Sequence, residues 1–255
     1  MNEPVPATGG VVHDDWGGWR RFTPARIALG RTGGSLPTAE VLALELAHAQ
    51  ARDAVHRPLD KPRLLAALGS EALLVSSAAG DRATYLRRPD LGRRLAAEAI
   101  VPRRPCDLVF VLADGLSPAA VESHGPAVLT AAQGQLAPDL LSVGPVVVAT
   151  QARVALGDAV AAAMGARAVA VLIGERPGLS SPASLGIYLT WAPSPGRTTD
   201  ADRNCVSNIW AGGLSPEAAA ATLAWLFRAA RALGRTGVAL KDESGGVARL
   251  TDGDH

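Results

Sequence analysis

The sequence contains little cysteine and no cluster of metal-binding residues. Only Cys106 and Cys205 occur among its 255 residues, and neither belongs to a CxxC spacing or a Cys/His cluster. A structural zinc site needs about four such ligands, so the sequence argues against one. We expect two reduced thiols, as is usual for an intracellular protein.

The chain also lacks a large charge of either sign and a long apolar run. Its formal net charge of +1 gives no electrostatic reason to expect nucleic acid or an anionic membrane as a partner. The longest aliphatic tract, residues 143–173, is interrupted by Arg153, Asp158 and Arg167, which argues against a membrane span. The N-terminal residues do not resemble a signal peptide. We therefore expect a soluble, cytoplasmic protein.

Aromatic residues make up only 4% of the chain, so few large side chains are available to build a ligand pocket from this chain alone. No strand is followed by GxGxxG, a P-loop or a GxSxG elbow, the motifs of dinucleotide binding, phosphoryl transfer and hydrolysis. No nucleophile, base and orienting group can be assembled around His124. The sequence is more typical of a binding or scaffold subunit than of a self-sufficient enzyme.

What is present is an alternation of apolar strands and helices. Strands are predicted at residues 71–80, 107–115, 144–151, 167–175 and 184–193. Helices are predicted at residues 35–55, between Pro89 and Pro102, at 117–136 with a break near Gly125 and Pro126, and at 154–166 and 215–234. This alternation predicts an α/β fold with a Rossmann-like, mostly parallel sheet and flanking helices.

The elements divide the chain into three expected parts. Residues 1–19 are rich in glycine and polar groups, which favours a flexible N-terminal arm. Residues 20–105 are expected to form a mainly helical N-terminal region. Residues 106–255 are expected to form the Rossmann-like domain.

Two of the predicted strands end in a carboxylate. Asp114 ends the strand at 107–115, and Glu175 ends the strand at 167–175. Ligands of open α/β sheets bind at the carboxyl ends of strands. Asp114 suits an N-cap of the next helix and a ligand contact equally well. Glu175 precedes Arg-Pro-Gly, a turn and not a helix start, which favours a ligand contact.

Residues 194–213 form a long polar stretch in an otherwise apolar half of the chain, and Cys205 lies within it. So many donors and acceptors on one segment indicate contact with something other than solvent. An ordinary capped loop is the alternative interpretation.

Several segments together resemble the small (light) subunit of ethanolamine ammonia-lyase. They occur in the order of that family over roughly residues 20–240, and the most specific are GERPGL and ADRNCVSNI. The segments are GRTGG (30–34), RPDLGRRLAAEAI (88–100), LADGLSPAAV (112–121), GERPGLSSPASLGIYLTW (174–191) and TTDADRNCVSNIWAGGLSPEAAA (198–220).

The resemblance implies a function for the chain within a complex. The enzyme of this family converts ethanolamine to acetaldehyde and ammonia with adenosylcobalamin as cofactor. Its large subunit is a TIM barrel that holds the substrate and the catalytic residues, and its small subunit covers the cobalamin at the interface. The chain alone is then expected to be inactive, within a cytoplasmic complex that is either free or enclosed in a bacterial microcompartment.

The resemblance also implies three cofactor contacts in this sequence. They fall on Val154 in QARVAL, Glu175 in GERPG and Cys205 in DRNCVSN. Cys205 is not expected to bind cobalt, because this family keeps the benzimidazole as the lower ligand, and a buried structural thiol remains an alternative role for it. Two other functions stay open: a stand-alone Rossmann-type nucleotide-binding module, and a purely structural subunit.

Overall fold

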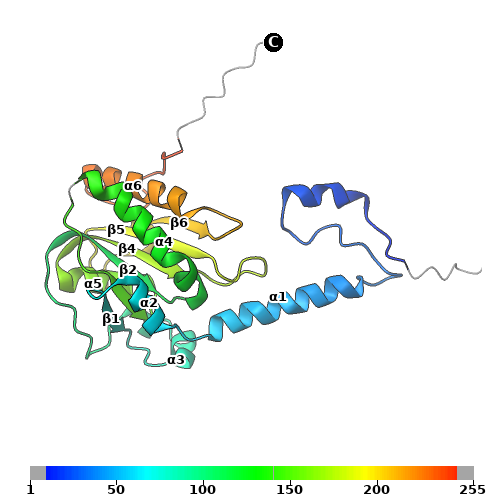
Figure 1. Cartoon of the computed structure of the whole chain (residues 1–255), viewed down its shortest axis with the longest axis horizontal. Coiled ribbons are helices and arrows are strands. Elements are labelled where there is room, and N and C mark those ends of the chain that lie inside the picture. The colour runs from blue at the N-terminus through cyan, green and yellow to red at the C-terminus, as the bar shows by residue number, and fades with distance from the viewer. Residues whose placement is uncertain (1–9, 140, 246–255) are drawn as a thin grey trace, which may run out of the picture. The chain divides into compact units, whose positions relative to one another are not determined.

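The structure is a computed structural model that describes residues 10–139 and 141–245. These residues form two compact units, one ending at Asp53 and one beginning at Ala54. The first unit contains η1 (Asp15–Phe22) and most of α1 (Thr38–His56), and the second contains the sheet (Figure 1). The predicted arm at 1–19 lies partly outside the described residues, and its last positions belong to η1.

The second unit is built on a six-stranded sheet with the order β1-β3-β2-β4-β5-β6. The first four strands in this order pair in parallel, and β5 and β6 continue the sheet in antiparallel pairs. The prediction of an α/β fold with a mostly parallel sheet is confirmed. The strands are β1 (Leu73–Ser76), β2 (Cys106–Ala113), β3 (Val147–Thr150), β4 (Ala166–Gly174), β5 (Leu185–Trp191) and β6 (Asn204–Ile209).

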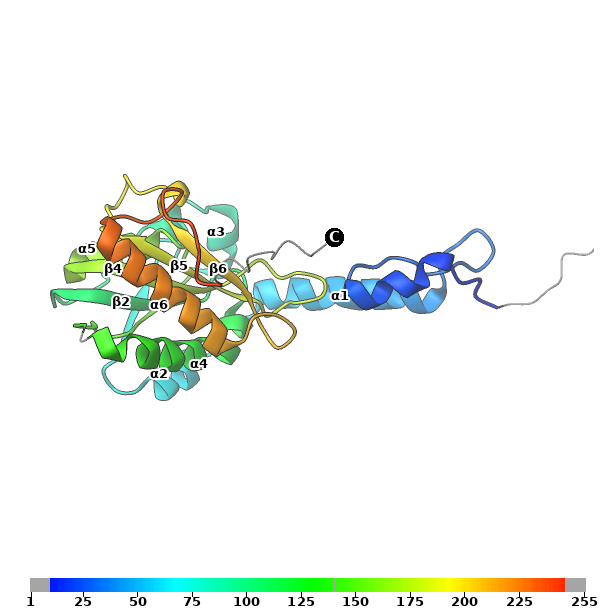
Figure 2. The ribbon, with the colours of Figure 1, turned by 90° about the horizontal axis from the view of Figure 1, so that it is seen from above.

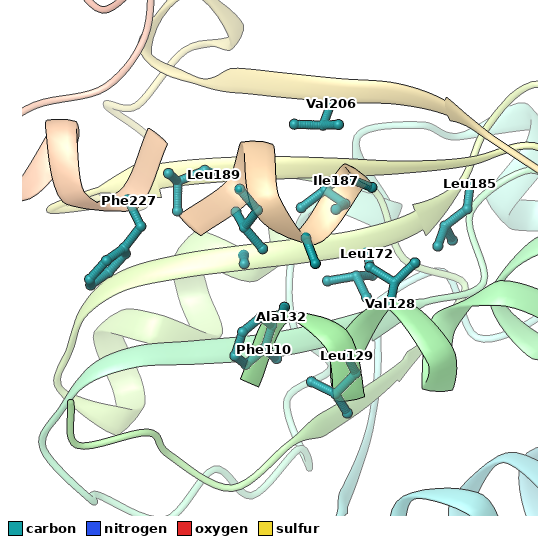
Figure 3. Close-up of a cluster of buried hydrophobic side chains, with 14 of the residues drawn as sticks. Phe110, Val128, Leu129, Ala132, Leu172, Leu185, Ile187, Leu189, Val206 and Phe227 are labelled. Carbon is teal, nitrogen blue, oxygen red and sulfur yellow. The ribbon is translucent and has the colours of Figure 1, made fainter. Parts of the chain in front are cut away.

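The central strands are apolar at nearly every position because helices cover both faces of the sheet. On β2, Leu108, Phe110 and Leu112 face a core shared with α4 (Pro118–Leu136) and α6 (Pro216–Leu233). The alternate residues of β2 face the core beneath α5 (Leu156–Met164). Figure 2 shows α4 and α6 side by side over the sheet, and Figure 3 shows Phe110 and Phe227 within their core.

Part of the region expected to be mainly helical belongs to the sheet. Residues 54–105 supply α2 (Lys61–Leu68), α3 (Arg82–Arg87) and the edge strand β1 to the second unit. The helix predicted between Pro89 and Pro102 is wrong, because only the short η2 (Leu91–Arg93) forms there. The chain directly after η2 is extended instead and pairs beside the end of β1, with Ala96 N–H donating to the carbonyl of Ser76 at 3.0 Å, before a turn at 97–98.

The predicted break in the helix at 117–136 is also wrong. α4 is continuous, with Pro126 inside it. Proline removes one backbone hydrogen bond, but Val121, Val128 and Ala132 are fully buried on either side of it, and this packing stabilises the helix across Pro126. Ser117 does not cap the helix through its side chain; its hydroxyl donates to the carbonyl of Pro182 at 2.7 Å.

The backbone after β2 lies directly against the end of β4. Leu116 N–H donates to the carbonyl of Gly174 at 3.0 Å, and Gly115 adopts a left-handed φ of 56°. A Cβ on Gly115 would collide with the carbonyl oxygen of Gly174, and a Cβ on Gly174 would collide with that of Ser117. Glycine at both positions therefore sets how closely these two strand ends approach.

Replacing Gly115 with alanine tests this close approach. We expect Gly115→Ala to lower the free energy of unfolding by about 3 kcal/mol, since the left-handed backbone costs about 1 kcal/mol and overpacking against a backbone oxygen costs about 2 more. Gly196→Ala is the matched control, because Gly196 has φ 76° but no atom within 4 Å of an added Cβ. Urea unfolding measures both variants, and equal losses would contradict the collision.

Candidate functional site

A cavity of about 440 Å³ opens where the central strands end. Its walls come from the loops after β2 and β3, the end of β4, helix α3 and strand β5. The lining residues are Gly115 and Leu116, Arg153 and Val154, Ile173 to Arg176, Tyr85, and Tyr188. The candidate site therefore lies at the carboxyl edge of the sheet, where the carboxylates at two strand ends predicted it.

Asp114 does not cap the next helix, and its carboxylate is engaged by the protein itself. Its side chain is 2% exposed, and its two carboxylate oxygens accept the backbone N–H groups of Gln151 (2.8 Å) and Ala152 (3.0 Å). Arg82 Nη1 lies 3.7 Å from Oδ2 of the same carboxylate. Burial raises the pKa of Asp114, while the two N–H bonds and Arg82 oppose the rise. Asp114 therefore fixes the loop after β3 from beneath the cavity.

Val154 and Glu175 line the same cavity, although they come from different loops. Val154 lies in the loop that Asp114 holds and is half-buried. The carboxylate of Glu175 accepts the hydroxyl of Ser184 at 2.6 Å and the backbone N–H of Asn208 at 3.4 Å. These two bonds orient the carboxylate and leave acceptor capacity on its oxygens.

Cys205 is joined to this cavity through Tyr188. The two residues are directly opposite one another on β5 and β6. Cys205 is exposed, so it is not the buried structural thiol that the sequence left open as an alternative. Cys106 is the buried thiol of the two. Reduced solvation raises the pKa of the Cys205 thiol, and the nearby carboxylate of Glu175 adds to the rise.

Much of the polar stretch at 194–213 serves the fold. It contains the edge strand β6, which the sequence analysis missed because only Val206 and Ile209 of that strand are buried. Arg203, 2% exposed, donates to both oxygens of Asp158 on α5 at 2.7 Å. Asn204 donates to the carbonyl of Leu240 at 2.8 Å. These side chains contact the protein itself, whereas Cys205, opposite Tyr188, and Asn208, whose N–H donates to Glu175, lie next to residues of the cavity.

Tyr85 and Arg153 also line the cavity, and the sequence analysis selected neither. Arg153 directly precedes Val154 in the QARVAL motif, which was a usable signal. Tyr85 had no signal of this kind, because its short helix α3 was not predicted. Over residues 10–139 and 141–245, no group of three or more His, Cys, Asp or Glu side chains could hold a metal ion. Within those same ranges no helix is both long and apolar enough to cross a membrane.

The two thiols should react very differently with alkylating reagents. We expect iodoacetamide to label Cys205 before the buried Cys106, and the labelling rate to keep rising above pH 9, because the pKa of Cys205 is raised. Mass spectrometry of timed reactions measures both rates, with Cys205→Ser as the control. A rate that levels off near neutral pH would contradict the raised pKa.

Comparisons with known proteins agree on one family. Residues 13–241 match the family model described as "Ethanolamine ammonia-lyase light chain (EutC)". The chain is 58% identical to the ethanolamine ammonia-lyase small subunit of Bradyrhizobium diazoefficiens, over 88% of this chain and 89% of that protein. It is 54% identical to the protein of that name from Rhodopseudomonas palustris, over 88% and 89%, and 52% identical to that from Xanthomonas campestris, over 91% and 89%. This chain therefore belongs to the ethanolamine ammonia-lyase light-chain family.

Proposed function

We propose that this chain is the small subunit of an adenosylcobalamin-dependent ethanolamine ammonia-lyase and that it holds the cofactor against a TIM-barrel large subunit. The complex would convert ethanolamine to acetaldehyde and ammonia in ethanolamine catabolism, in the cytoplasm or in a bacterial microcompartment. The observation that supports the proposal is that Val154 and Glu175, from separate loops, line one cavity, and that Cys205 lies opposite Tyr188, which lines it too.

The residues of the cavity suit the periphery of a corrinoid. A corrin ring carries amide groups and a nucleotide tail, and Glu175 can accept N–H or O–H groups from either. Val154 offers apolar surface beside it, and the small Cys205 allows a large ring to approach closely. When bound, the cofactor supplies a cobalt–carbon bond whose homolytic cleavage generates the radical that the reaction needs.

The size of the cavity supports a shared site. Pockets that enclose a drug-sized ligand measure roughly 300–1,000 Å³, and a corrinoid with its nucleotide tail is larger than such a ligand. A cavity of about 440 Å³ can cover only part of it. A second protein surface would have to cover the rest and exclude water, which is the part we assign to the large subunit. The present chain then contributes binding and orientation, and we assign it no catalytic residue.

Reconstitution tests the proposed function. The purified chain, the large subunit and their mixture are each assayed for adenosylcobalamin binding and for ammonia release from ethanolamine. We expect tight binding and activity from the mixture only. Activity of this chain alone would favour a stand-alone module, and full cobalamin affinity of the large subunit alone would favour a purely structural role for this chain. Either result would contradict the proposal.

Glu175→Gln tests the contact assigned to the carboxylate. The substitution keeps the shape of the side chain but removes its charge, so we expect the reconstituted complex to bind adenosylcobalamin about tenfold more weakly, the effect of losing one hydrogen bond to a charged group. Glu71→Gln is the control, because the Glu71 side chain is 83% exposed and precedes β1 at the opposite edge of the sheet. Equilibrium dialysis gives both dissociation constants, and a loss of the fold in Glu175→Gln, seen by circular dichroism, would assign Glu175 a structural role.

A further inference from the structure

Two arginines lie over the ring of Tyr85 beside the cavity. The guanidinium carbon of Arg153 is 4.5 Å from the ring centroid, and that of Arg82 is 4.8 Å away. The tyrosine is held in place by its hydroxyl, which donates to the carbonyl of Ala152 at 3.3 Å. Two cations therefore share one aromatic ring at the wall of the candidate site.

The charges of the two arginines are balanced differently. Arg82 faces Asp114 at 3.7 Å and donates to the carbonyls of Val55 (2.7 Å) and Gly115 (2.8 Å), so its position is set by the protein, although its Nη2 is buried without a hydrogen-bond partner among the described residues. Arg153 makes no ion pair with any carboxylate of the described residues, and its Nε is buried without a hydrogen-bond partner there. An unpaired buried donor costs about 1–3 kcal/mol. Arg153 is therefore a cation at the cavity wall that still lacks an acceptor.

The surrounding chain makes room for Arg153 in this position. Its backbone N–H donates to the carbonyl of Gly92 at 2.8 Å, which ties the loop after β3 to η2. A Cβ on Gly92 would lie 3.0 Å from both Arg153 Cγ and the Tyr85 ring. The side chains of Tyr85 and Arg153 and the backbone of Gly92 thus form one packed unit, with the guanidinium at the cavity.

We propose that Arg153 binds the phosphodiester of the nucleotide tail of the corrinoid, an inference that rests on the proposed function. The amide fringe of the corrin is neutral, so the phosphodiester is the permanent anion of its periphery. A guanidinium group matches the oxygens of phosphate in geometry and charge. The charges of Arg82 and Arg153 repel one another, and an anion bound beside Arg153 would offset part of this repulsion.

Arg153→Gln and Arg153→Lys in the reconstituted complex test this assignment with three ligands. These are hydroxocobalamin, cobinamide phosphate, and cobinamide, which lacks the nucleotide tail and its phosphate. We expect Arg153→Gln to weaken binding of hydroxocobalamin and cobinamide phosphate roughly 10- to 100-fold and to leave that of cobinamide within about twofold. Arg153→Lys keeps the charge and should lose less. Equilibrium dialysis provides the dissociation constants.

Arg167→Gln is the matched control, since Arg167 is 68% exposed and lies at the opposite end of β4. Circular dichroism and size-exclusion chromatography establish that each variant folds and assembles. Unchanged binding of hydroxocobalamin by Arg153→Gln would overturn the inference, and so would an equal loss for cobinamide, which would place Arg153 at the amide fringe. A wild-type complex that binds none of the three ligands would instead overturn the proposed function itself.

A structure of the complex with hydroxocobalamin tests the contact between Arg153 and the phosphodiester independently of dissociation constants. A guanidinium nitrogen of Arg153 within about 3.2 Å of a phosphate oxygen would support the inference. A guanidinium that contacts only corrin amides or protein groups would overturn it.

Discussion

The buried carboxylate of Asp114 holds the candidate site together. It lies at the end of a central strand and accepts the backbone N–H groups of Gln151 and Ala152, the two residues that precede Arg153 and Val154. A carboxylate that is 2% exposed is stable only when such partners satisfy it. Through these bonds one strand end determines where the next loop places its side chains. This interaction therefore positions Arg153 and Val154, the two residues of the loop after β3 that we assign to the cofactor.

The second constraint is the close backbone contact between Gly115 and Gly174. It brings the loop after β2 against the end of β4, next to Glu175. The cavity is thus shaped by short polar and backbone contacts at its base, with Tyr85, Arg153 and Tyr188 among its walls. A site of this kind is rigid at its base and open above, which suits a subunit that covers one side of a ligand shared with a partner.

The buried pair of Arg203 and Asp158 connects the edge strand β6 to α5. Burial alone would lower the pKa of Arg203, but the bonds to Asp158 raise it, so the guanidinium stays charged inside the protein. This pair fixes the start of β6 and with it the position of Cys205. The polar segment at residues 194–213 therefore has one part that stabilises the fold and another part that lies beside the candidate site.

The sequence by itself determined the α/β class, the central strands, and the helices α5 and α6, because long apolar periods and proline or glycine boundaries are local signals. It also pointed to Glu175, which lines the cavity, since a carboxylate at the tip of a buried strand is unusual. It could not determine the extended path after η2, the unbroken α4 or the edge strand β6, because these depend on packing and pairing with residues far along the chain. Only the tertiary structure decided that Asp114 supports a loop and that Tyr85 stands beside Arg153, since those contacts join segments whose proximity no local pattern encodes.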